Sequence, residues 1–166
     1  MNMINKAIQY LSGKSCSEQE LRDYLENEFN DLPKLEHCVS EAVTFLIKHN
    51  LISDLRLAEN LTMHYAHKGN QFIHHLLQQR KIKKDVIEKS LNRIPNESVR
   101  AMEAVQNKMT TLSHLNFDEA KEILIRFMIG RQFSLETTNQ VIDELNAKKT
   151  YRLKTKIWSN ITALAS

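Results

Sequence analysis

Five basic side chains lie in a stretch of the chain that contains no acidic residue. Residues 60–84 have no Asp or Glu, and their cations are Lys68, Arg80, Lys81, Lys83 and Lys84. Clustered ammonium and guanidinium groups neutralise phosphates or form charge-assisted hydrogen bonds with carboxylates. A run of charge is also typical of a solvated surface without a partner. Because the flanking residues are rich in Asp and Glu, we favour an anion-binding surface here.

A second acid-free block ends the chain. Residues 148–166 carry five cations and no Asp or Glu, and the cations are Lys148, Lys149, Arg152, Lys154 and Lys156. Leu153, Ile157 and Ile161 keep a helical spacing there. A helix that extends the fold is the favoured interpretation, and a dedicated binding arm is the alternative.

Catalytic and metal-binding patterns are weak. Four of the seven histidines, His64, His67, His74 and His75, lie in the central stretch. A structural zinc site usually needs four nitrogen or sulfur ligands, and neither Cys16 nor Cys38 is near them in sequence. There is no glycine-rich phosphate loop, nucleophile elbow or metalloprotease helix motif. We therefore expect no metal, no cofactor and no enzymatic activity.

The bulk composition predicts a soluble protein with reduced thiols. Two cysteines are too few for a disulfide framework, and no apolar run approaches the ~20 residues that cross a bilayer. The first residues lack the apolar region of a signal peptide. We expect a cytoplasmic protein with no membrane partner.

The elements that must position the cations are predicted to be helices. The chain has only three glycines and two prolines, and its apolar residues recur every three or four positions. Ser17 and Glu20 form a capping-box pattern, and Ser53, Asn96 and Ser134 are expected to begin later helices. On the helix that follows Asn96, we expect an inward stripe formed by Val99, Met102, Val105 and Met109.

Apolar spacing also indicates an internal repeat. Spacings of four and five residues separate Ile73, Leu77 and Ile82, and they recur in Leu124, Met128 and Phe133. Leu21, Leu25 and Phe29 match with one residue fewer. These patterns predict an all-α fold of three tandem three-helix repeats, at residues 1–52, 53–95 and 96–147, in an elongated, curved array. Residues 148–166 form a basic C-terminal extension.

These residues resemble the RecX family of regulators of bacterial RecA recombinase. The family signature corresponds to Asn50-Leu51-Ile52-Ser53-Asp54-Leu55-Arg56-Leu57-Ala58, then Lys68-Gly69, Ile73 to Leu77 and Arg80-Lys81-Ile82. Ser17 to Leu21 resembles the motif of the first repeat, and Arg126 to Phe133 that of the third. The resemblance covers about residues 5–147. Asn50, Ser53, Lys81 and Gln132 replace a family Gly, Asp, Gly and Gly, so the chain is identified as a divergent member.

The resemblance implies a non-enzymatic regulator. Relatives bind in the groove of the RecA filament on single-stranded DNA and restrain its recombinase and coprotease activities, which belong to DNA repair and the SOS response. Arg56, Arg126 and Arg131 join the expected partner- or DNA-binding cations, and we expect a monomer. The alternative is a helical module that binds DNA or RNA by itself through its basic surface.

Overall fold

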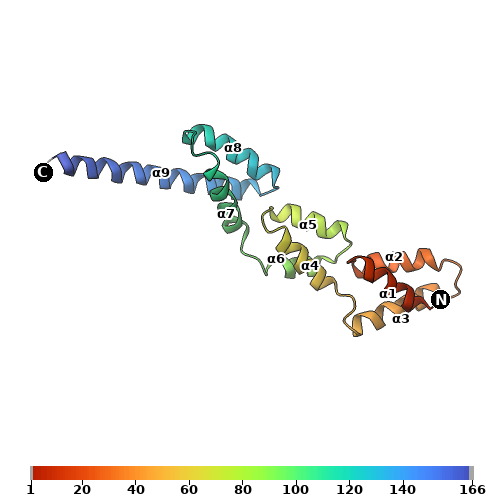
Figure 1. Ribbon diagram of the computed structural model, residues 1–166. Coiled ribbons are helices and arrows are strands. Elements are labelled where there is room, and N and C mark those ends of the chain that lie inside the picture. Colours follow the sequence, from red (N-terminus) through yellow and green to blue (C-terminus); the bar gives the residue numbers. More distant parts are fainter. Residues whose placement is uncertain (1, 165–166) are drawn as a thin grey trace. The chain divides into compact units, whose positions relative to one another are not determined.

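The computed structural model describes the backbone of residues 2–164 and the side chains of residues 2–149. Figure 1 shows a helical chain, and no strand occurs in the described residues. The helices are α1 (Met3–Gly13), α2 (Glu18–Glu28), α3 (Leu35–Lys48), α4 (Asp54–His64), α5 (Asn70–Gln79), α6 (Lys84–Leu91), α7 (Glu97–Thr110), α8 (Phe117–Gly130) and α9 (Leu135–Leu164). The all-α prediction is confirmed, whereas the three-repeat arrangement stays a prediction.

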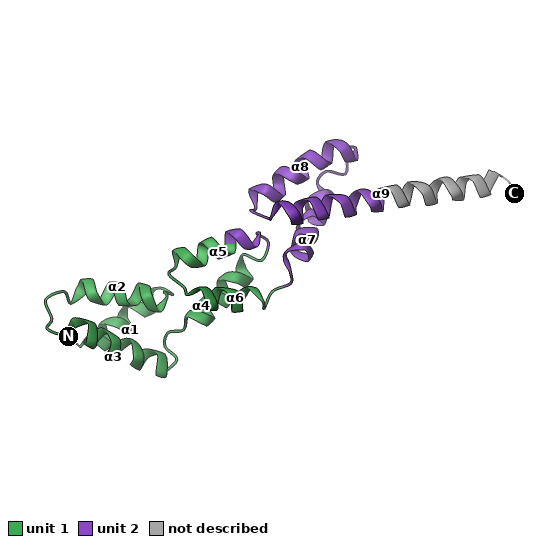
Figure 2. Cartoon of the chain, turned by 180° about the vertical axis from the view of Figure 1, so that it is seen from behind, with its two compact units in different colours: residues 1–66, 73–94 green, residues 67–72, 95–166 purple. Residues whose placement is uncertain are grey.

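The chain divides into two compact units (Figure 2). Unit 1 comprises Met1–Ala66 and Ile73–Ile94, and unit 2 comprises His67–Phe72 and Pro95–Ser166. The first turn of α5 therefore belongs with unit 2 and the rest of that helix with unit 1. The predicted repeat boundaries are not tested by this division and stay predictions.

The predicted helix starts are formed by side-chain caps. The Ser17 hydroxyl accepts a hydrogen bond from the Glu20 amide at 3.1 Å, and the Glu20 carboxylate accepts one from the Ser17 amide at 2.8 Å. This reciprocal capping box satisfies two amides that the helix cannot bond internally. The predicted caps of the later helices also accept from an amide of the first turn, at Ser53, Asn96 and Ser134.

Three helices end at a residue with left-handed backbone. At the end of α5, Lys81 has φ 56°, its amide bonds to the Gln78 carbonyl at 2.8 Å, and the Ile82 amide bonds to the Leu77 carbonyl at 3.1 Å. This pair of bonds is the Schellman motif, which usually carries glycine at the left-handed position. The same two bonds close α3 and α8, at Asn50 and Gln132. The non-glycine residues Lys81 and Gln132 thus keep the turn and accept its steric cost.

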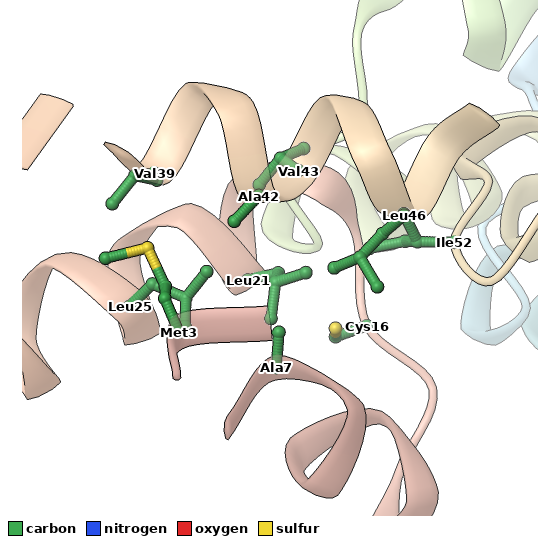
Figure 3. Packing of buried hydrophobic residues seen from close by; sticks show 10 residues of the cluster. All are labelled: Met3, Ala7, Cys16, Leu21, Leu25, Val39, Ala42, Val43, Leu46 and Ile52. Atoms are coloured by element: carbon green, nitrogen blue, oxygen red, sulfur yellow. The ribbon is translucent and has the colours of Figure 1, made fainter. Parts of the chain in front are cut away.

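One apolar cluster of unit 1 is built from α1, α2 and α3 (Figure 3). Leu21 and Leu25 of α2 are fully buried, and α3 contributes Val43 and Leu46, also fully buried. These positions are three and four residues apart, so each helix presents one apolar stripe to the others. The predicted inward side of α2 is confirmed for these two leucines.

The core of unit 2 differs from the prediction on α7. Val105 of α7 is fully buried and packs in the cluster that contains Leu124 and Met128 of α8, but Val99 is 54% exposed. The neighbouring Arg100 is only 4% exposed. The prediction that Val99 faces inward is therefore wrong, because α7 directs the hydrogen-bonded side chain of Arg100 towards the inside and leaves Val99 exposed.

Hydrogen bonds to distant backbone explain why Arg100 can be buried. Its Nε donates to the Pro95 carbonyl at 2.8 Å, its Nη1 donates to the Lys68 carbonyl at 2.6 Å, and its Nη2 donates to the Asn70 side chain. The backbone amide of Asn70 in turn donates to Glu97 Oε1 at 2.7 Å. A buried guanidinium is tolerated when its donors are satisfied, and this network holds the start of α5 against α7 within unit 2.

Gly69 makes a close backbone contact in the same unit. Its amide donates to the Arg131 carbonyl at 2.8 Å. A Cβ at this position would lie 1.8 Å from the Gln132 carbonyl oxygen, which is far inside van der Waals contact. The glycine is therefore required by the approach of the two backbones.

Leu77 and Met128, the predicted equivalent core positions, are both fully buried. Replacing either residue by Ala should lower the free energy of unfolding by about 2–5 kcal/mol, because each substitution removes buried methylenes and leaves a cavity. Chemical denaturation of each variant measures the change. Midpoints within error of the wild-type value for both variants would contradict the assigned burial.

Gly69→Ala should destabilise unit 2 by about 1–3 kcal/mol, the usual cost of forcing extra volume into a packed contact. Gly13→Ala is the matched control, because nothing lies within 4 Å of a Cβ built there. Thermal denaturation of the two variants compares them. An equal effect of the two substitutions would contradict the close approach at Gly69.

Candidate partner-binding surface at the basic corner

The turn between α5 and α6 and the first residue of α6 carry four cations, Arg80, Lys81, Lys83 and Lys84, which we call the basic corner. Ile82, in the middle of this turn, is 5% exposed and anchors it to unit 1. Lys81, Lys83 and Lys84 are exposed, and Arg80 is half-buried. The Schellman bonds fix the path of the turn, so the cations leave it in defined directions.

Carboxylates of α2 bind two of these cations. Arg80 Nε donates to Glu20 Oε1 at 2.8 Å and Nη2 donates to Glu20 Oε2 at 3.1 Å, which is a bidentate pair. Arg80 Nη2 also donates to the Ser15 carbonyl at 2.8 Å. Lys81 forms an ion pair with Asp23. Both contacts lie within unit 1 and link residues about 60 positions apart in the sequence.

These contacts shift the pKa values of the two carboxyl groups. Partial burial acts to raise the pKa of Glu20, but the hydrogen bonds from Arg80 and Ser17 outweigh it and the pKa lies below its usual value. The hydrogen bond from Lys81 lowers the pKa of Asp23. Both groups are therefore ionised at neutral pH, and the charges of Arg80 and Lys81 are compensated inside the chain.

Lys83 and Lys84 are the cations of the corner that remain directed at solvent. Lys83 occupies the N-cap position of α6, and its side chain makes no capping hydrogen bond. It lies within electrostatic range of Glu18 and Asp54, two acids whose pKa values are raised mainly by burial. Lys84 lies 3.9 Å from Glu88 and its side chain is 81% exposed, so that pair is weak.

The other predicted cations have separate surroundings. Arg56, in unit 1, donates to the Asn50 carbonyl at 2.6 Å. In unit 2, the Lys68 ammonium lies 5.2 Å from the Phe72 ring centre, and the Arg131 guanidinium lies 3.8 Å from that of Phe127. Arg126 pairs with Glu122 at 3.3 Å. The structure thus gives each residue a local partner, and their predicted contribution to binding stays a prediction.

Part of the C-terminal basic block can be placed. Lys148 pairs with Glu144 at 2.7 Å, and the Lys149 ammonium lies 4.8 Å from the Phe117 ring centre. Arg152, Lys154 and Lys156 lie outside the residues whose side chains are described. The backbone of α9 runs through this block to Leu164, as the helical spacing predicts.

The cysteines and histidines form no evident reactive group. Cys16 is buried, and burial raises the pKa of its thiol to about 11, so the thiolate is scarce at neutral pH. Within the described residues, no three His, Cys, Asp or Glu side chains are grouped so that they would hold a metal ion. The helices of the same residues include none that is long and apolar enough to cross a membrane.

Sequence reasoning found the cations of the corner but missed their partners. Glu20 was recognised only as a helix cap, although it is also the carboxylate that binds Arg80. Asp23 was not singled out. The sequence signal for these partners is the acidic excess of α2, where five acidic residues stand against a single cation, Arg22.

Comparison with known proteins identifies similar sequences. The chain matches no protein-family model. It is 27% identical over 148 residues to proteins named "Regulatory protein RecX" from Staphylococcus aureus strains JH9 and Newman, which covers 86% of this chain and 53% of each relative. The chain therefore spans about half the length of the curated relatives that it matches.

Two crystal structures have a similar fold. RecX from Lactobacillus salivarius superposes with a TM-score of 0.70 at 22% identity, covering 87% of this chain and 95% of that one. A second structure, described as regulatory protein RecX, has a TM-score of 0.61 at 19% identity and covers 85% of this chain and 73% of that one. At this identity the structural likeness establishes the fold, and the sequence matches carry the family resemblance.

Glu20→Gln should lower the free energy of unfolding by about 1–2 kcal/mol at pH 7, because it weakens charge-assisted hydrogen bonds to Arg80 but keeps an acceptor for the helix cap. Since the pKa of Glu20 is lowered on folding, its stabilisation is present above the unfolded pKa and is lost as pH falls through the folded value. Denaturation from pH 7 to pH 3 should show the gap between variant and wild type closing. A gap independent of pH would contradict the ion pair.

Proposed function

We propose that this chain, a divergent member of the RecX family, regulates a RecA recombinase by binding its filament on single-stranded DNA. The observation that supports this most is the similarity to regulatory proteins named RecX over 86% of the chain, together with a shared fold at a TM-score of 0.70. In this proposal the chain lowers the recombinase and coprotease activities of the filament. It acts by binding and catalyses no reaction of its own.

The basic corner supplies part of the docking surface. Lys83 and Lys84 are exposed, and no acidic residue forms a close, buried pair with either of them among the described side chains. Carboxylates of the recombinase or phosphates of the bound strand supply the opposing charge. Arg80 and Lys81 act indirectly, because their bonds to Glu20 and Asp23 hold the turn that presents the two lysines.

Binding to the filament is separable from binding to DNA alone. Fluorescently labelled chain is titrated with a preformed RecA filament, with RecA alone and with the same single-stranded DNA alone, across a salt series. Affinity for the filament well above that for bare DNA supports the proposal. Equal affinity for bare DNA and filament, with the same steep loss in salt, would instead indicate a stand-alone nucleic-acid-binding module.

Lys83→Glu combined with Lys84→Glu should weaken filament binding by about tenfold or more at low salt, because it replaces two attractions by two repulsions. Either single change should do little, since exposed ion pairs contribute only about 0–1 kcal/mol each. The fold should persist, because acidic residues are favourable at the start of a helix and both positions lie at the start of α6.

The matched control is Lys48→Glu combined with Lys121→Glu, which makes the same change in net charge at two exposed lysines that are not part of the corner, one on α3 and one on α8. Thermal unfolding of both double variants verifies folding. If the two folded variants bind the filament equally well at every salt concentration, the basic corner is an ordinary solvated surface.

A further inference from the structure

Unit 1 contains a groove of which Arg56 is the one residue named so far as a candidate for binding. Its volume is about 590 Å³, and it runs along one face of α4, opposite the end of α1. The α4 residues on its wall are Arg56, Leu57, Asn60, Leu61 and His64, which are spaced three or four apart and therefore share a face. We call this feature the α4 groove.

The rim of the α4 groove is basic. Lys14, Arg56 and His64 line it, and no Asp or Glu is among the described residues of its wall. The Arg56 guanidinium is held by its bond to the Asn50 carbonyl at 2.6 Å, and the Lys14 ammonium lies 4.2 Å from the Tyr10 ring centre. Neither cation takes part in an ion pair within the described chain, so both are available to an external carboxylate.

The floor of the groove is aliphatic. Leu11, Leu51, Leu57 and Leu61 line it, and the wall includes no Phe, Tyr or Trp. Leu51 is 48% exposed. It follows the left-handed residue Asn50 at the end of α3, and the corresponding residues at the other two Schellman ends are only 5% and 3% exposed. Leu51 therefore lacks the cover that its counterparts Ile82 and Phe133 have.

We propose that the α4 groove binds a segment of a protein partner in which Asp or Glu side chains lie next to aliphatic ones. The carboxylates would pair with Lys14 and Arg56, and the aliphatic side chains would cover Leu51 and Leu61. Within the proposed function, this segment belongs to a protein of the recombinase filament, and the inference rests on that function for the identity of the partner.

The composition of the wall favours a peptide over a nucleic acid. Single-stranded nucleic acid is held by cations together with aromatic side chains on which bases stack, and each stacked base contributes about 1–3 kcal/mol. The described wall of the groove offers no Phe, Tyr or Trp ring for stacking, and its leucines match aliphatic side chains. Cations at the rim with leucines between them therefore complement an acidic, aliphatic peptide.

The test uses the full chain and three labelled probes in fluorescence anisotropy. The first is a synthetic helical peptide with Glu and Leu on one face, the second is the same peptide with Lys in place of Glu, and the third is an oligothymidylate of the same net charge as the first. The Glu/Leu peptide should bind about tenfold or more tightly than the Lys/Leu peptide, a difference that reports the basic rim.

Asn60→Glu places a carboxylate on the wall of the groove, four residues from Arg56, where it pairs with that cation in place of the ligand. Met63→Glu is the matched control: Met63 lies on the same helix, is 70% exposed and does not line the groove. Asn60→Glu should weaken binding of the Glu/Leu peptide by about tenfold, and Met63→Glu should change it less than twofold.

Thermal midpoints of both variants verify folding. The inference is overturned if the two variants bind the Glu/Leu peptide equally, or if Asn60→Glu weakens binding of the oligothymidylate and leaves peptide binding unchanged. Failure of the proposed function is a separate result, namely that the wild-type chain does not bind the filament. If the wild type binds the filament, Asn60→Glu should weaken that binding and Met63→Glu should not.

Discussion

The carboxylate of Glu20 joins α2 of unit 1 to the turn after α5, and the presentation of the basic corner depends on it. It accepts a hydrogen bond from the Ser17 backbone amide, which closes the capping box of α2, and it accepts two hydrogen bonds from Arg80. Arg80 also binds the Ser15 carbonyl, so the loop before α2 and the turn after α5 are held by one pair of side chains. Partial burial makes such a bidentate pair stronger than an exposed one.

This pair also decides which cations of the basic corner are available to a partner. In the sequence, residues 60–84 contain five cations and no acidic residue. In the fold, α2 supplies carboxylates to Arg80 and Lys81, so the charge of the corner that stays largely uncompensated is that of Lys83 and Lys84. Charge segregation along a chain is therefore an incomplete guide to charge on its surface, because folding places distant segments side by side.

Local rules were sufficient to predict much of the fold. The capping box at Ser17 and the helix starts at Ser53 and Asn96 each depend on a few neighbouring residues, and all three are confirmed. The predicted inward face of α7 was wrong at Val99, because the apolar periodicity of this helix is compatible with more than one inward-facing set of residues. Which set faces inward depends on the hydrogen bonds that Arg100 donates to the carbonyls of Lys68 and Pro95, and Lys68 lies 32 residues away in the sequence. The cations of the corner were likewise recognisable by type, whereas their ion pairs and the α4 groove arise only from tertiary contacts.

ATP hydrolysis by RecA on single-stranded DNA, measured while the full chain is titrated in, tests the proposed regulatory role most directly. A chain that docks on the filament and restrains it should lower the steady-state hydrolysis rate progressively and to saturation. Addition of excess single-stranded DNA should not restore the rate if the target is the filament itself. An unchanged rate at a large excess of the chain, or a loss of rate that free DNA abolishes, would contradict regulation by filament binding.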